Sequence, residues 1–155
     1  MKKLLLVSLL SAMGTSTFAA SDCSILYAAD DKLIDIIQEN KFEFDNYDAL
    51  CQRLNNANAR IKLSYMTGTS DRETTAVVIA TVKDKNLPIE SNTYSRSMWS
   101  NSEQSSSVEK RLLMNAVNDA VSNINQKDID ELNANRKKLG FKTYPVATNT
   151  KSNKK

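Results

Sequence analysis

The sequence predicts a small α+β domain in which a long amphipathic helix packs on a three-stranded antiparallel meander. Residues 74–82 are apolar on both alternating sets of positions, as in a central strand that is covered on both faces. Residues 60–66 and 93–99 alternate on one side only. Residues 107–124 carry a broad apolar stripe at helical spacing. Because the connections between the three apolar runs are short, residues 74–82 are expected in the middle of the sheet.

The first 19 residues have the pattern of a cleaved secretory signal peptide. Lys2 and Lys3 precede a short apolar run that ends in small residues, and Ala19 fits the cleavage position. Asp22 stands where a lipobox needs a small neutral residue, so no lipid attachment is expected. No later run reaches the roughly 18 to 20 apolar residues that span a membrane. The expected location is therefore periplasmic or secreted, without stable insertion into a membrane.

The rest of the chain divides into a domain and a tail. Residues 20–146 have a length typical of one α+β domain, and residues 147–155 are a polar, basic segment expected to be disordered. Of the 21 basic residues, two lie in the leader and seven lie from Arg136 onward, so residues 20–135 carry 12 basic against 18 acidic side chains. An acidic body therefore carries a basic end.

The two cysteines, Cys23 and Cys51, are expected to form a disulfide bond, because export places them in an oxidising compartment. Closing a loop of this length contributes roughly 3 to 4 kcal/mol to stability in the chain-entropy model. The chain contains no histidine, which argues against a zinc site at the two thiols.

Two short helical segments precede the strands. Asp30 and Asp31 are expected to cap a helix that reaches about Glu39, and a second helix follows Asp45 with Cys51 on its apolar face. If the first helix continued straight back to Cys23 in a plain hairpin, the two cysteines would lie roughly 18 Å apart at about 1.5 Å per residue. A disulfide needs Cα atoms within about 7 Å. Either residues 22–29 fold back, which we favour, or the two helices cross steeply.

Two helices are expected after the strands. Ser106 and Glu109 have the spacing of a capping box for the first of them. A short last helix runs from Asp128 to about Leu139, with Gly140 as its stop signal. The stripe of the first helix consists of Val108, Leu112, Leu113, Ala116, Val117, Ala120, Val121 and Ile124. This helix is expected on one face of the sheet, and the N-terminal segments or a partner chain on the other.

The composition excludes several chemistries. Without histidine there can be no Ser-His or Cys-His nucleophile pair and no imidazole acid–base catalysis. Only two glycines follow the leader, so there is no glycine-rich phosphate loop, and no cofactor or metal is expected. Carboxylate pairs of the glycosidase kind remain, namely Asp71 with Glu73 and Asp84 with Glu90. Both pairs fall in expected turns, where charged residues are ordinary.

The candidate binding segment lies within residues 91–107. It is polar, yet it contains Tyr94, Arg96, Met98 and Trp99, which are the residue types enriched at the centres of protein interfaces. By alternation, Tyr94, Arg96 and Met98 share one side of the strand and Trp99 takes the other. The alternative is that Tyr94 and Met98 face the core while Trp99 covers the sheet edge.

These observations favour a non-enzymatic binding or accessory protein that recognises another envelope or secreted protein, in the manner of an inhibitor or an immunity-type protein. The alternative is a carboxylate-dependent hydrolase or lyase of the cell wall, which rests only on the expected compartment. Nucleic acid is not expected as a partner, because the body of this exported chain is acidic. The basic tail suits an anionic partner, and the sequence is compatible with a homo-oligomer.

Overall fold

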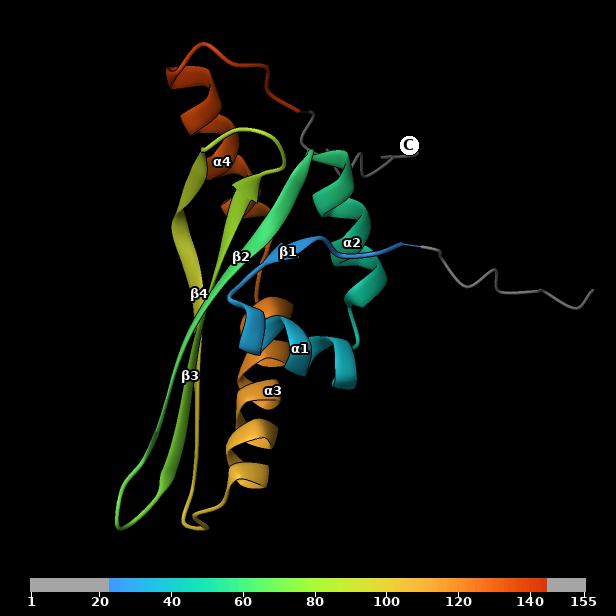
Figure 1. Ribbon diagram of the computed structural model, residues 1–155. Helices are drawn as coiled ribbons and strands as arrows, with labels where there is room; N and C mark the ends of the chain where they lie inside the picture. Colours follow the sequence, from blue (N-terminus) through green and yellow to red (C-terminus); the bar gives the residue numbers. More distant parts are fainter. Residues whose placement is uncertain (1–22, 145–155) are drawn as a thin grey trace, which may run out of the picture.

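The computed structural model describes residues 23–144, which form one sheet and four helices (Figure 1). The expected signal peptide and basic tail lie outside the described residues. In chain order the elements are β1 (Tyr27–Ala28), α1 (Asp31–Asn40), α2 (Tyr47–Asn56), β2 (Ala59–Thr69), β3 (Thr74–Asp84), β4 (Glu90–Asn101), α3 (Ser106–Ser122) and α4 (Gln126–Lys138).

The sheet has the strand order β1-β2-β3-β4. Strands β2, β3 and β4 form the expected antiparallel meander, with β3 in the middle. The prediction of three strands is wrong, because β1 pairs with β2 in parallel, Tyr27 opposite Ile61 and Ala28 opposite Lys62. A strand of two residues is too short to produce an alternating pattern, so the sequence gives no periodic signal for it.

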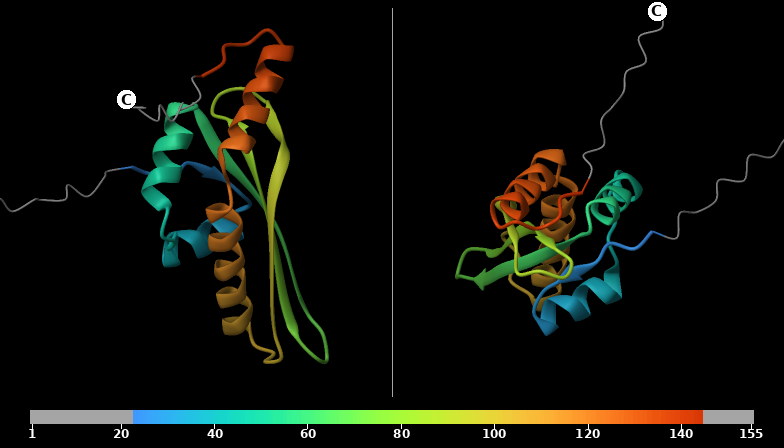
Figure 2. Two further views of the ribbon diagram at one scale, coloured as in Figure 1. Left: turned by 180° about the vertical axis from the view of Figure 1, so that it is seen from behind. Right: turned by 90° about the horizontal axis from the view of Figure 1, so that it is seen from above.

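All four helices lie on one face of the sheet (Figures 1 and 2). Helix α3 packs against β3 and β4, α4 packs mainly against β4, α2 packs against β2, and α1 lies beside α3. We call this face the inner face and the opposite one the outer face. The expectation that the N-terminal segments cover the other face is therefore wrong (Figures 1 and 2), and the alternative, a partner chain, stays a prediction. Val77 and Ile79 on the outer face are half-buried, whereas Val78 on the inner face is fully buried.

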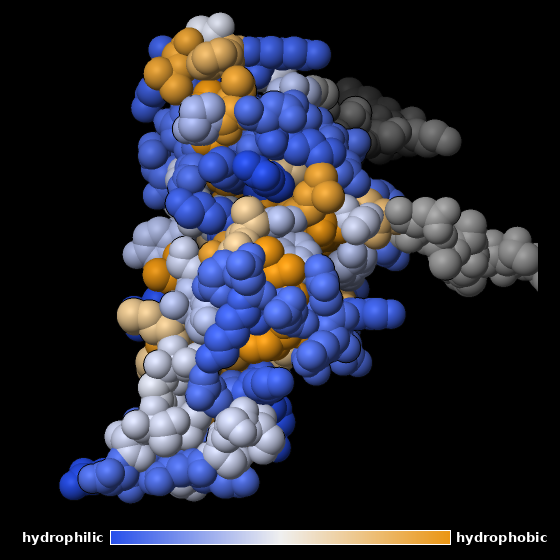
Figure 3. All heavy atoms as spheres, viewed as in Figure 1, coloured by the Kyte–Doolittle hydropathy of each residue, from blue (hydrophilic) through white to orange (hydrophobic). Residues whose placement is uncertain are grey.

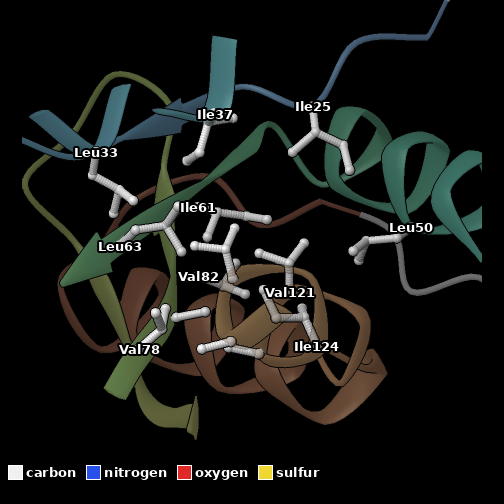
Figure 4. Packing of buried hydrophobic residues seen from close by; sticks show 14 of the residues in the cluster. Ile25, Leu33, Ile37, Leu50, Ile61, Leu63, Val78, Val82, Val121 and Ile124 are labelled. Carbon is white, nitrogen blue, oxygen red and sulfur yellow. The ribbon is translucent and has the colours of Figure 1, made fainter. Parts of the chain in front are cut away.

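The core lies between the inner face and the helices (Figure 4). Ile61, Leu63, Val78 and Val82 come from the sheet and meet side chains of α1, α2 and α3. All eight positions of the stripe that predicted α3 are buried. The long helix is therefore confirmed in its place on the sheet.

The N-terminal segments are joined by the expected disulfide. Cys23 and Cys51 are bonded, with their Cα atoms 6.0 Å apart. The chain between Cys23 and α1 is extended and includes β1, which confirms that residues 22–29 do not continue the helix as far as they are described. Asp30 caps α1 by accepting a hydrogen bond from the backbone N–H of Leu33 at 3.0 Å, as expected.

The helix ends of the C-terminal half differ in detail from expectation. Helix α3 is capped by Ser105 and not by Ser106, because the extended residue Ser105 accepts the N–H of Val108. The capping box occurs instead at α4, between Asn125 and Asp128. Gly140 follows α4 with a φ of 76°, a conformation that favours glycine and ends the helix as predicted.

Candidate functional site: the outer face of the sheet

The outer face is built from the alternate residues of three long strands. Because side chains alternate across a strand and opposite residues form rows, the register defines which side chains are neighbours. The rows, read from β2 across β3 to β4, are Lys62–Thr81–Tyr94, Ser64–Ile79–Arg96, Met66–Val77–Met98 and Gly68–Thr75–Ser100. Figure 1 shows that no helix of the described residues lies over them.

The outer face combines short side chains in its middle with long side chains on both sides. On β3, Val77 and Ile79 are β-branched and half-buried. They are flanked by Met66 on β2, which is 69% exposed, and by Tyr94 and Met98 on β4, which are 64% and 62% exposed. In the space-filling view, apolar residues interrupt the polar surface along the left margin, on the side of the sheet (Figure 3). The apolar residues are thus adjacent in the sheet and accessible.

The charge of the outer face is positive. Lys62 Nζ lies 3.0 Å from Oε1 of Glu90, and Lys83 Nζ lies 3.7 Å from the same oxygen, so one carboxylate serves two lysines. Arg60 stands opposite Lys83, and its Nε is buried without a hydrogen-bond partner among residues 23–144. Arg96 forms no salt bridge within the described chain. The basic residues therefore exceed the acidic ones on this face, and a surface of this charge attracts anionic groups.

The structure brings together three of the four residues that the sequence predicted for binding. Tyr94, Arg96 and Met98 follow one another along the outer face of β4. Trp99 stands opposite Ala76 on the inner face, where it is 42% exposed beside α3 at the edge of the sheet. Tyr94 and Met98 do not face the core, so the alternative placement of these two side chains is wrong, whereas the edge position of Trp99 is found.

Sequence reasoning missed the contribution of β2 to this face. Met66 and Lys62 lie in the same rows as Met98 and Tyr94, although some thirty residues separate them in the chain. One signal was available, since Met66 is an apolar residue on the polar side of an otherwise alternating strand. Its significance depends on the strand pairing, which the sequence does not give.

The carboxylate pairs proposed from the sequence are found in different settings. Asp84 is buried beside Arg136, whose Nε donates to its Oδ2 at 2.7 Å. Burial raises the pKa of Asp84. Backbone hydrogen bonds from Asn86 and Leu87, together with Arg136, lower it by more than burial raises it, so the pKa lies below its ordinary value. Glu90 is held by two lysines. Thus both members of this pair are already engaged by basic groups.

The other pair, Asp71 and Glu73, is exposed in the turn between β2 and β3. Neither carboxylate forms an ion pair within residues 23–144. No group of three or more Cys, Asp or Glu side chains in this part of the chain is arranged to hold a metal ion. Both side chains are exposed to solvent, whereas small-molecule sites are usually concave and bury most of the ligand.

A hollow of about 350 Å³ lies on the helical side of the molecule, between α1 and the start of α2. It is lined by Tyr27, Phe42, Tyr47 and Lys41, among others. The rings of Tyr27 and Phe42 meet edge to face at a centroid distance of 5.3 Å, and Tyr47 packs tilted against Phe42 at 6.4 Å. Lys41, with a φ of 59°, ends α1 at its rim. The aromatic rings thus pack mainly against one another. Burial raises the pKa of Tyr27.

Among residues 23–144 there is no helix with the length and apolar content needed to cross a bilayer. Comparison with family models, with curated proteins and with solved structures finds no match for this chain.

Proposed function

We propose that this chain is an exported, non-enzymatic binding or accessory protein that recognises another envelope or secreted protein through the outer face of its sheet. The observation that carries the proposal is the accessible set Met66, Tyr94 and Met98 around Val77 and Ile79, with no described element over it. Contiguous exposed apolar residues on a monomer commonly mark an interaction site. Methionine, tyrosine and arginine are also among the residues enriched at interface cores.

The proposed compartment is supported by two features. The Cys23–Cys51 disulfide persists in oxidising environments such as the periplasm and the extracellular medium. The first 19 residues have the leader pattern described above. An inhibitor or an immunity-type protein fits this combination of small size, covalent cross-link and exposed binding face. The hydrolase alternative gains no support from the geometry, since Asp84 and Glu90 are both engaged by basic side chains.

A site-specific crosslinking experiment tests the proposal. A photo-reactive amino acid is placed at Met98 in the full chain, which is expressed with its leader in the native cell. The matched control carries the same amino acid at Gln52, which is exposed on α2 on the helical side. We expect a protein adduct from position 98 and none from position 52.

The captured protein is then purified and its affinity is measured. Met98→Glu is expected to weaken binding, whereas Gln52→Glu and Trp99→Ala are not, because both residues lie off the outer face. Absence of an adduct at position 98, or equal adducts at both positions, would contradict the proposal.

A further inference from the structure

We infer that the partner covers the outer face with an amphipathic helix that presents acidic side chains to Arg96 and to the basic end of the sheet. This inference rests on the proposed function and specifies the chemistry of the partner. Three properties of the outer face support it: the spacing of its rows, the different lengths of its side chains and the distribution of its charges.

The spacing of the rows suits a helix that runs along β3. Successive side chains on one face of a strand are about 6.8 Å apart. Residues four apart in an α-helix rise about 6.0 Å. A helix along β3 can therefore place consecutive i, i+4 side chains over the Val77 and Ile79 rows. Helix α3 packs against β3 and β4 on the inner face.

The heights of the side chains on the outer face also favour a helix along β3. Along β3 the outer-face residues Thr75, Val77, Ile79 and Thr81 are all β-branched and half-buried. The longer side chains of Met66 and Met98 rise on either side of Val77. The methionine side chain adapts its shape to irregular apolar surfaces, so Met66 and Met98 can pack around the apolar side chains of a partner helix.

The charges determine which helix fits. Arg96 stands in the row of Ile79 without an ion-pair partner in the described chain. Farther along the strands, Lys62 and Lys83 share the carboxylate of Glu90, and Arg60 stands opposite Lys83. Acidic side chains that flank the apolar side chains of the partner helix would lie next to these basic groups. Complementary charge raises both the specificity and the rate of association.

The same charges disfavour other occupants. A second copy of the chain, docked face to face, would bring basic residues against basic residues. Residues 147–155 carry three lysines and no acidic residue, so the tail of the chain does not complement the face either. An anionic lipid surface is planar, whereas long strands twist by about 20 to 25° relative to their neighbours. A helix along β3 follows this twisted surface better than a plane does.

The test uses two synthetic 18-residue helical peptides with identical leucine positions. One carries glutamate and the other lysine at the flanking positions. Each is titrated into the chain from Ala20 onward, labelled with ¹³C at the methionine methyl groups. Met66 and Met98 report on the outer face, and the buried Met114 of α3 is the internal control. We expect the glutamate peptide, and not the lysine peptide, to shift the signals of Met66 and Met98.

Charge reversal provides the matched variants. Arg96→Glu is expected to weaken binding of the glutamate peptide by roughly fivefold to tenfold, because it replaces an attraction by a repulsion. Arg111→Glu, at an exposed position of α3 on the helical side, is expected to leave the affinity unchanged. Vesicles containing phosphatidylglycerol are titrated in parallel and are expected not to shift Met66 or Met98.

Several results would overturn the inference. These are equal binding of the two peptides, an affinity that Arg96→Glu does not change, a response of Met66 and Met98 to the vesicles, or self-association through the same signals. If Met98 crosslinks to a protein while the glutamate peptide does not bind, the inference fails and the proposed function stands. If no adduct forms at Met98, the proposed function itself fails.

Discussion

Arg136 and Asp84 form a buried ion pair that joins α4 to the end of β3. The side chain of Arg136 is fully buried and that of Asp84 almost so, and Nε donates to Oδ2 at 2.7 Å. The guanidinium also donates to the side chain of Asn133 at 2.9 Å and to the backbone carbonyl of Asn58 at 3.0 Å. The ring of Tyr144 lies 4.7 Å from its central carbon. One buried cation thus connects the C-terminal helix, the sheet and the turn before β2.

Removal of one partner from this pair should strongly destabilise the fold. We expect Arg136→Met to lower the free energy of unfolding by about 3 to 5 kcal/mol, because Asp84 is left buried without its countercharge. Lys62→Met, which removes the exposed salt bridge to Glu90, should cost no more than about 1 kcal/mol. Urea unfolding of both variants measures the difference. Equal losses would contradict the structural role of the buried pair.

The same pair should make stability depend on acidic pH. The pKa of Asp84 in the folded chain lies below its ordinary value of 3.8, so its contribution is complete above that value. It is lost as the pH falls through the lower, folded-state pKa, because protonation of Asp84 leaves Arg136 unpaired. We expect Asp84→Asn to be less stable than the parent at pH 7 and to lose less stability on acidification. Urea unfolding at a series of pH values tests this expectation, and parallel pH profiles would contradict it.

Neighbouring residues of β3 should respond differently to the same substitution. Val78→Thr buries a hydroxyl among apolar side chains and should cost about 1 to 3 kcal/mol. Val77→Thr keeps the branched shape on the outer face and should change stability by less than about 0.5 kcal/mol. Both costs are measured by denaturant unfolding. A loss at Val77 as large as that at Val78 would mean that the outer face is also part of the core.

The disulfide should stabilise the domain by roughly 3 to 4 kcal/mol, the value expected for a loop of this length. Its two cysteines are 28 residues apart in the sequence. We expect neither thiol to be alkylated without prior reduction, and we expect the Cys23→Ser, Cys51→Ser double variant to unfold at lower urea concentration. Mass spectrometry after alkylation provides the first check. Labelling of both thiols in the unreduced chain would contradict the bond.

The single tryptophan, Trp99, should be partly accessible and independent of the outer face. It is 42% exposed on the opposite side of β4 from Met98. We expect acrylamide to quench its fluorescence at a rate between those of buried and free tryptophan, and Met98→Ala to leave that rate unchanged. A blue-shifted, fully protected emission would place Trp99 in the core instead.

The elements of this fold were predictable where the sequence is periodic. Helix α3 buries one face, so the apolar residues from Val108 to Ile124 recur at helical spacing in the sequence, and this spacing predicted the helix. One-sided alternation likewise predicted β2 and β4, and the continuous apolar run predicted β3. Each strand is longer than its apolar run, since pairing continues through polar residues such as Thr69 and Asn101. The two-residue strand β1 left no signal, because its pairing depends on a distant segment.

The layer arrangement could not be predicted for a different physical reason. Val77 and Ile79 are apolar and were expected beneath a second layer, but β-branched residues favour strands whether or not they are covered. The candidate site was predictable on β4, where Tyr94, Arg96 and Met98 are close in the chain. Its other half, on β2, required the register that sets Met66 opposite Val77.

The central claim is that the outer face of the sheet is uncovered in the free protein, and methionine accessibility tests it most directly. The chain from Ala20 onward is labelled at its methionine methyl groups, and a soluble paramagnetic agent is added. We predict strong broadening of the signals of Met66 and Met98, which are 69% and 62% exposed, and little broadening of the signal of Met114, which is 7% exposed. Protection of Met66 and Met98 to the level of Met114 would contradict the claim, because it would mean that another part of the chain or a second copy covers the face.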